Sequence, residues 1–200
     1  MKKELLEQLL SFVSANPSQV TERLSSEYVT FLQIAEATDE CLAETLGGNA
    51  NLALYLKLCT TLAARRISDG FSFGKRHSED EIRKYLSSLL FGMPEETVYM
   101  LSIDPSGRCV AADRVGEGIV NYSSVLPKKV LDAARRRGAK SVVIAHNHPG
   151  ACLSPSQNDI TATEVLAQLL HDSGITLERS YVVSGMRCEE VKKMFFKRGI

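Results

Sequence analysis

The spacing of apolar residues changes its period once along the chain, and this change divides the sequence into two parts. Up to about residue 68, apolar side chains recur at intervals of three and four, the spacing of one helix face. The segments with this pattern are ELLEQLLSFV (4–13), YVTFLQIAEAT (28–38) and ANLALYLKLCTTLAARRI (50–67). Gly47 and Gly48 interrupt the pattern before the last segment. We therefore predict a small all-helical region over residues 1–68, in which a glycine turn joins two helices.

Beyond this region, short apolar runs of the strand type alternate with segments of helical period. The strand candidates are ETVYMLSID (96–104), RCVAADRVGEGIV (108–120), KSVVIAHN (140–147) and TLERSYVVSG (176–185). The helix candidates are SEDEIRKYLSSLLFG (78–92), SSVLPKKVLDAARRRGA (123–139), SQNDITATEVLAQLLHDSG (156–174) and EEVKKMFFKRG (189–199). Strands that alternate with helices build layered domains, so we predict an α/β domain over residues 81–200. Residues 69–80, which contain glycines and serines, are the predicted linker.

The composition is that of a globular protein without a strong charge bias. Of the 200 residues 44% are apolar, and 24 basic side chains balance 24 acidic ones. Non-specific binding to nucleic acid needs many lysine and arginine contacts to phosphates, so zero net charge argues against it as the role of the whole molecule. The five cysteines are scattered without a C-x-x-C pair, which favours reduced thiols over a disulfide framework.

The sequence contains no segment that predicts a membrane span or a secretory leader. The apolar stretch at the start of the chain is broken by Glu4 and Glu7, whereas a signal peptide needs an uninterrupted apolar core. No run approaches the roughly 18 consecutive apolar residues that crossing a bilayer requires. We therefore expect a cytoplasmic protein without a membrane partner.

The segment SVVIAHNHPGACLSPSQND (141–159) holds the candidate chemistry. His146 and His148 stand one residue apart after an apolar strand, and such residues of an extended chain point to the same side. Ser156 and Asp159 are three apart at a helix start, which places them on one face. Two imidazoles and one carboxylate suit Zn²⁺ with a water in the fourth position, as in catalytic sites. An isolated H-x-H is more often a pair of loop histidines, but the added serine and aspartate favour a metal site.

The pattern H-x-H-x(7)-S-x-x-D over these residues resembles the signature of the JAMM, or MPN-plus, metalloproteases. The flanking text AHNHPG…SPSQND is similar to the RadC branch of that group. The similarity runs from about residue 77 to 190 and includes ETVYMLSID, GIVNYSSVLPKKVLDAARRRGAKSVVIAHNHP (118–149) and Thr163. This resemblance implies a mixed sheet flanked by helices, in a JAMM/MPN-like, deaminase-like layered fold. The N-terminal helices resemble more loosely the family's helix-hairpin-helix region, in a degenerate form.

The resemblance also implies a role for each site residue. The implied zinc ligands are His146, His148 and Asp159. Glu96 is the implied general base, which takes a proton from the attacking water and passes it to the leaving amine. Glu95 and Glu117 stay as alternatives for this base. Ser156 is the implied hydrogen-bond donor to the developing oxyanion, and it is at the same time a good N-cap for the helix that follows.

Two stretches depart from the family's pattern. Gly150–Leu153 replaces the family's S-G-D-P, and Arg179-Ser180 stands where an Asp-His pair is common. Cys152 lies in the first stretch and is interpreted as a small loop residue, because three ligands already complete the expected set. Loss of a supporting pair lowers metal affinity by about 10- to 100-fold in metal sites. The departures therefore bear on how tightly the metal is held and on catalysis.

The prediction that combines these observations is a zinc-dependent metallohydrolase of RadC/JAMM type, which cleaves an amide or isopeptide bond in a peptide or protein. The alternative is a non-catalytic module associated with DNA repair, which binds nucleic acid or protein and keeps a structural metal. The basic run KKVLDAARRRGAK (128–140) is interpreted as a solvated helix face, because no aromatic residues interleave with its charges. The substrate and the oligomeric state have no signal in the sequence.

Overall fold

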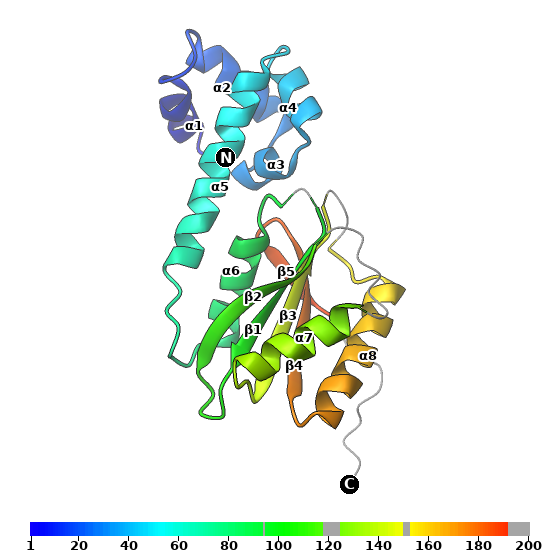
Figure 1. The fold of residues 1–200 in the computed structure, drawn as a ribbon. Coiled ribbons are helices and arrows are strands. Elements are labelled where there is room, and N and C mark those ends of the chain that lie inside the picture. The colour runs from blue at the N-terminus through cyan, green and yellow to red at the C-terminus, as the bar shows by residue number, and fades with distance from the viewer. Residues whose placement is uncertain (94, 118–124, 150–152, 192–200) are drawn as a thin grey trace. The chain divides into compact units, whose positions relative to one another are not determined.

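The computed structural model describes the chain except for residues 94, 118–124, 150–152 and 192–200, which Figure 1 draws as a grey trace. The chain falls into two compact units, Met1–Arg66 and Ile67–Ile200. Each unit has buried apolar clusters of its own. The buried apolar residues of each part of the sequence thus pack against residues of the same part.

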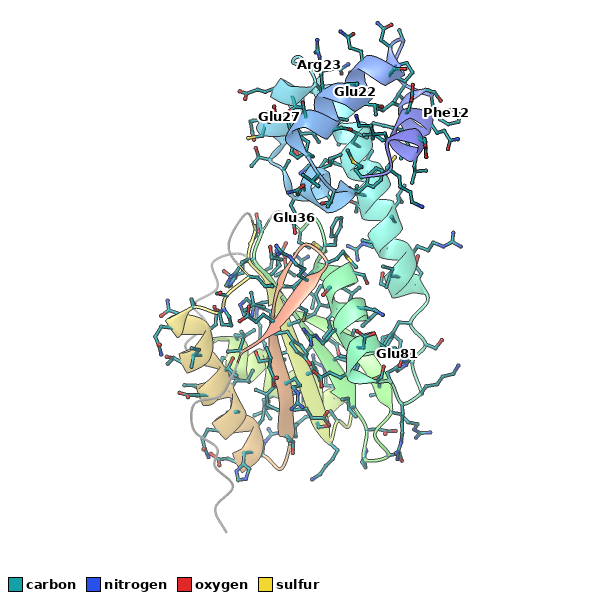
Figure 2. All side chains as sticks on the ribbon, turned by 180° about the vertical axis from the view of Figure 1, so that it is seen from behind. Phe12, Glu22, Arg23, Glu27, Glu36 and Glu81 are labelled. Atoms are coloured by element: carbon teal, nitrogen blue, oxygen red, sulfur yellow. The ribbon has the colours of Figure 1, made fainter. Side chains whose placement is uncertain are left out.

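The first unit is built from helices. They are α1 (Lys3–Leu10), α2 (Pro17–Glu27), α3 (Phe31–Glu36), α4 (Asp39–Thr45) and α5 (Ala50–Asp69). Their apolar faces meet in one core, in which Leu6, Leu24 and Leu42 are fully buried. The first predicted segment is longer than α1, and Phe12 beyond the helix end is 83% exposed (Figure 2). α2 has no counterpart among the predicted segments, because PSQVTERLSSE carries too few apolar residues to show a period.

The predicted glycine turn joins α4 to α5. Gly47 and Gly48 have φ angles of +69° and +86°, in the left-handed region that glycine enters without steric cost. The Gly48 N–H donates to the Ala43 carbonyl oxygen at 2.8 Å and so closes α4. Asn49 Oδ1 then accepts the Leu52 N–H at 3.0 Å, which satisfies one of the open donors at the start of α5.

The second unit is organised around a sheet with the strand order β2-β1-β3-β4-β5. Its strands are β1 (Thr97–Ile103), β2 (Cys109–Glu117), β3 (Ser141–Asn147), β4 (Thr176–Ser184) and β5 (Arg187–Glu190). β3 and β4 run parallel and the other neighbouring pairs are antiparallel, so the sheet is mixed, as the resemblance implies. β3 is central and buried along its whole length, which explains its continuous apolar run.

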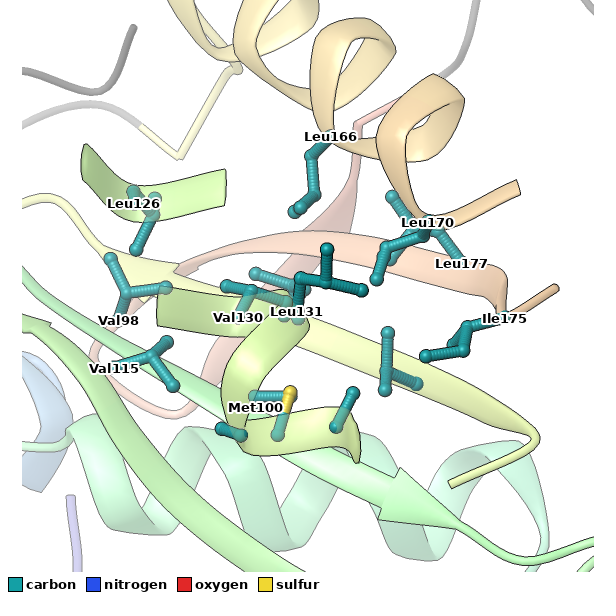
Figure 3. Packing of buried hydrophobic residues seen from close by; sticks show 14 of the residues in the cluster. Val98, Met100, Val115, Leu126, Val130, Leu131, Leu166, Leu170, Ile175 and Leu177 are labelled. Atoms are coloured by element: carbon teal, nitrogen blue, oxygen red, sulfur yellow. The ribbon is translucent and has the colours of Figure 1, made fainter. Parts of the chain in front are cut away.

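Helices cover both faces of this sheet (Figure 1). They are α6 (Glu79–Leu90), α7 (Val125–Arg136) and α8 (Gln157–Asp172). α7 and α8 pack on one face through a core that contains Met100, Val130 and Leu170 (Figure 3). α6 packs on the other face, against Leu101 and Tyr181. The predicted layered α/β fold is confirmed. None of the helices in the described part of the chain has the length and apolar character needed to cross a bilayer.

The helix predicted over residues 189–199 is wrong at its start. Glu189 and Glu190 belong to β5, which pairs antiparallel with β4. A tight turn at Gly185, with φ at +58°, folds the chain back for this pairing. The partner strand, rather than any periodicity of the segment itself, makes these residues extended. Residues 192–200 of the predicted helix lie outside the described part of the chain.

Candidate metal centre

Two of the predicted ligands stand at the end of the central strand β3. His146 lies within the strand and is 4% exposed, and His148 is the first residue after it. The His148 N–H donates to the Val183 carbonyl oxygen at 3.1 Å, which continues the bonding between β3 and β4 past the strand end. Pro149 follows, and it holds the preceding residue extended while offering no N–H of its own. Strand alternation therefore places both imidazoles on the same side of the sheet.

The third predicted ligand comes from the first turn of α8. Ser156 is the N-cap of this helix, and its Oγ accepts the Asp159 N–H at 3.2 Å. Asp159 Oδ2 in return accepts both the Ser156 N–H and the Ser156 hydroxyl, each at 2.7 Å. This reciprocal capping box turns the Asp159 carboxylate back toward the helix start. The carboxylate is 7% exposed and lies next to both imidazoles.

The donor atoms of the three predicted ligands have the spacing of a small-cation site. His146 Nε2 lies 3.1 Å from His148 Nε2. Asp159 Oδ1 lies 3.0 Å from His146 Nε2, and Asp159 Oδ2 lies 3.3 Å from His148 Nε2. Ligand atoms that each stand about 2.0–2.1 Å from a tetrahedral zinc ion are about 3.3 Å from one another. The three groups therefore fit a shared divalent cation in both chemistry and spacing.

A fourth group, the carboxylate of Glu96, is brought in by the pairing of β1 with β3. Val98 stands opposite His146 in the antiparallel register, so the residues just before β1 lie beside the end of β3. One carboxylate oxygen of Glu96 lies within 4.8 Å of a donor atom of each predicted ligand. Glu96 is half-buried at this place. The register of two strands thus joins residues that are far apart in the sequence.

The two alternative glutamates are not members of this group. Glu95 is exposed, one residue before Glu96. Glu117 stands opposite Thr97 at the end of β2, and its carboxylate forms an ion pair with Arg114 at 2.5 Å. In the part of the chain that the structure describes, the group around the histidines is the one set of histidine, cysteine and carboxylate donors close enough to share an ion.

The protonation of Asp159 suits a metal ligand. Burial raises the pKa of its carboxyl, but hydrogen bonds from His146 and Ser156 outweigh burial and hold the pKa well below its usual range. Asp159 is therefore a carboxylate at neutral pH, which is the form that coordinates metals. The capping serine thus supports the charge of the ligand as well as its direction.

Of the two departures from the family's pattern, Arg179-Ser180 lies in the described part of the chain. Arg179 forms ion pairs with one glutamate of β5 and one of α6, at 3.3 and 3.8 Å. Ser180 is buried, and its hydroxyl lies 3.1 Å from the Thr163 hydroxyl. Thr163 and Ser180 line a small cavity of about 20 Å³ that two of the predicted ligands also line. Residues 150–152, the core of the other departure, lie outside the described part of the chain.

Asn147 is a site residue that the sequence pattern did not reveal. It stands between the two histidines and is 5% exposed. Its side chain is hydrogen-bonded to the N–H of Thr97 and to the carbonyl oxygens of Met93 and Glu95. These backbone groups lie on both sides of Glu96. The position of Asn147 inside H-N-H was the one signal, and the sequence does not show what its amide contacts.

The segment that contains these donor groups matches a known protein family. The profile of the family described as RadC-like JAB domain matches residues 76–190, which is more than half of the chain. The chain belongs to the RadC-like JAB domain family. The family expected from the H-N-H-P segment is thereby confirmed. The RadC-like domain contains all four groups of the metal centre.

Some relatives of the protein match more than its RadC-like domain. A UPF0758 protein of Cupriavidus taiwanensis is 29% identical over 91% of this chain and 81% of its own length. A UPF0758 protein of Chromobacterium violaceum is 29% identical over 92% of this chain and 81% of its own length. One from Cupriavidus pinatubonensis is 35% identical over 52% of this chain and 46% of its own length. The two longer matches extend past the RadC-like domain into the N-terminal helices.

Proposed function

We propose that the RadC-like domain is a zinc-dependent hydrolase that cleaves an amide or isopeptide bond in a peptide or protein. The observation that carries this proposal is the convergence of three donor groups at 3.0–3.3 Å, with the carboxylate of Glu96 beside them. Two imidazoles and one carboxylate leave a fourth zinc position for water or substrate. That arrangement is the ligand set of catalytic zinc rather than of structural zinc.

The residues of the centre divide the work of such a hydrolysis. When bound, zinc supplies a Lewis acid that acidifies a water molecule and polarises the scissile carbonyl. His146 and Asp159 are buried, so their ligand atoms have little freedom to move. Glu96 takes the proton of the attacking water on its carboxylate and passes it to the leaving amine nitrogen. Glu96 is then a carboxylate again at the end of each turnover.

Ser156 is the residue proposed to donate a hydrogen bond to the oxyanion. In the resting arrangement its hydroxyl donates to Asp159 Oδ2 at 2.7 Å. Donation to an oxyanion therefore requires the hydroxyl to rotate away from Asp159. The carboxylate still keeps the Ser156 N–H as a donor, at 2.7 Å. The same serine can thus support the ligand before the reaction and the developing negative charge during it.

A structural metal site is the second candidate, and the place of Glu96 is the observation that favours it. Its carboxylate lies within 4.8 Å of the other donor groups. If Glu96 coordinates the ion as a fourth ligand, the site is closed, as structural zinc sites are. The domain then serves as a binding module for nucleic acid or protein, without hydrolysis.

Glu96→Gln separates the two candidates, because glutamine keeps the size of the side chain and loses its basicity. If the domain is a hydrolase, the Glu96→Gln variant keeps about one zinc ion per chain. Cleavage of linear and isopeptide-linked test peptides, followed by mass spectrometry, falls about 10²- to 10⁴-fold. For the structural site, zinc content falls and cleavage is absent from the wild type as well. Duplex DNA binding that weakens steeply with salt would then favour a nucleic-acid module.

His148→Ala tests the centre itself, and His171→Ala is its matched control. The His171 side chain is 78% exposed in the last turn of α8, so its loss leaves the donor groups intact. We expect zinc to be lost from His148→Ala and retained by His171→Ala, measured by elemental analysis of the purified chains. Equal zinc in the wild type and in His148→Ala would refute the metal centre. Full cleavage by Glu96→Gln would refute Glu96 as the base.

A further inference from the structure

Asn147 carries a buried amide that no step of the proposed hydrolysis uses. Its neighbours on both sides are the histidine ligands, and strand alternation turns its side chain to the opposite face of β3. Oδ1 accepts the Thr97 N–H at 2.8 Å. Nδ2 donates to the carbonyl oxygens of Met93 and Glu95, both at 3.2 Å. Both amide hydrogens and one oxygen lone pair of Asn147 are therefore engaged.

Two partners of this amide, the carbonyl oxygens of Met93 and Glu95, belong to the segment that delivers Glu96. The third partner is the N–H of Thr97, the first residue of β1. This segment connects α6 to β1, and its described residues belong to no helix or strand. The pairing between β1 and β3 ends at Val98 and His146. One residue further along, the Asn147 side chain takes the place of the backbone partner that a longer strand would supply. The amide thus extends the sheet to the residue next to Glu96.

The backbone is held on both sides of Glu96. On one side the Glu95 carbonyl oxygen accepts from Asn147 and also from the Thr97 hydroxyl, at 3.1 Å. On the other side the Thr97 N–H is bonded to Asn147. Arg114 Nη2 donates to the Thr97 hydroxyl at 3.4 Å and ties this segment to β2 as well. These contacts leave the Glu96 side chain as the part of the segment directed toward the donor groups.

We propose that Asn147 is a positioning residue, which couples the strand that carries the histidines to the backbone around Glu96 and so sets where that carboxylate stands. The inference rests on the proposed function of Glu96. A side chain with two rotatable bonds that makes three hydrogen bonds out of reach of most solvent moves with its strand, so Glu96 keeps its distance from the ligands. An amide that merely closes a connection would stabilise the fold without any special effect on Glu96.

A double-mutant cycle on the full chain distinguishes these two roles. The proteins are the wild type, Glu96→Gln, Asn147→Ala and the double variant, each loaded with Co²⁺, whose visible absorption responds to groups near the ion. We expect all four to bind Co²⁺, because the three ligands are intact. Glu96→Gln should change the spectrum in the wild-type background and change it by less than half as much in the Asn147→Ala background, since coupled residues are non-additive. Asn147→Ala alone should slow peptide cleavage about 10- to 100-fold.

Two further variants keep this test decisive. Asn147→Asp retains the oxygen that accepts the Thr97 N–H and replaces the two N–H donors with an oxygen that repels the carbonyl groups. It therefore uncouples the backbone around Glu96 from β3 with little change in side-chain volume. This variant replaces Asn147→Ala in the cycle if that protein does not fold. Leu86→Ala, at a fully buried position of α6, is the control for lost stability. It should melt earlier than the wild type and keep the full spectral response to Glu96→Gln.

Each outcome of the cycle has one meaning. A smaller response to Glu96→Gln in both Asn147 variants, with a full response in Leu86→Ala, supports the positioning role. An equal response in all backgrounds overturns it and leaves Asn147 as a residue that only stabilises the connection. A wild-type chain that binds no Co²⁺ instead overturns the proposed function, and the positioning role falls with it. A wild-type spectrum that ignores Glu96→Gln overturns the positioning role alone.

Discussion

The hydroxyl of Ser156 has two functions in the structure, and its removal separates them. It caps α8 by accepting the Asp159 N–H at 3.2 Å, and it donates to the carboxylate of the same residue at 2.7 Å. α6 begins with the same arrangement, in which Ser78 and Glu81 form the equivalent hydrogen bonds at 2.8–3.3 Å. No donor group of the metal centre belongs to that second box. Ser78→Ala is therefore the matched control for Ser156→Ala.

The expected cost of Ser156→Ala depends on whether the metal is present. Loss of a serine N-cap destabilises a protein by about 1 kcal/mol, so both variants should lose that amount in the presence of a chelator. Ser156→Ala also frees the carboxylate of Asp159 from one donor. Loss of such support lowers metal affinity about 10- to 100-fold, which corresponds to about 1.4–2.7 kcal/mol. Saturating zinc stabilises the folded form according to its affinity. In zinc, Ser156→Ala should therefore lose about 2.4–3.7 kcal/mol in total.

Thermal unfolding in EDTA and in excess zinc measures this difference. At about 2–4 °C per kcal/mol for a chain of this size, the melting temperature in zinc should fall about 5–15 °C for Ser156→Ala and about 2–4 °C for Ser78→Ala. Zinc competition against a chromophoric chelator should give the same loss of affinity directly, and Ser156→Thr should restore it. Equal losses for the two alanine variants in zinc would refute the reasoning. Asp159 would then be held by the imidazoles and the helix backbone, without help from the serine hydroxyl.

Two groups outside the metal centre have shifted pKa values with measurable effects. Burial raises the pKa of the Cys109 thiol to about 11, so at pH 8 about one such thiol in a thousand is ionised, against about a quarter for an ordinary thiol. Alkylation by iodoacetamide should be at least about 100-fold slower than at the exposed Cys41, and equal rates would contradict the burial. The backbone N–H of Arg108 is the main cause that holds the pKa of the Asp104 carboxyl below its usual value. The wild type should thus melt above Asp104→Asn at pH values higher than the unfolded-state pKa of about 3.9, with a gap that closes as the pH falls through the folded-state value. A gap that widens in acid would contradict this.

The sequence predicts those helices and strands whose buried face carries enough apolar residues to form a recognisable pattern. β3 is predicted over 140–147 and observed as Ser141–Asn147, because a strand covered on both faces carries a continuous apolar run, here 142–145. Two elements that the pattern misses depend on partners. α2 has few apolar residues and packs by one narrow face. β5 has four residues, and its extended form comes from the pairing with β4. Neither carries a period long enough to be recognised in one sequence.

The candidate metal centre divides in the same way, between residues related by local spacing and a residue placed by long-range register. His146, His148 and Asp159 lie in one strand–loop–helix segment, so their spacing is visible in the sequence. Which glutamate joins them depends on the register that sets Val98 opposite His146, because a slip by one residue would turn every side chain of the strand to the other face.

Asn147 belongs to the local H-N-H motif and also contacts a segment that strand register brings beside it. The histidines on either side of it each supply a donor nitrogen of the site. Its own amide contacts the distant segment that contains Glu96. Its partners are backbone N–H and carbonyl groups, which every non-proline residue has. Such contacts leave no mark on the identity of the partner residues, so a motif like H-N-H shows its ligands in the sequence and hides the contacts of its central residue. The three-dimensional structure is needed to assign them.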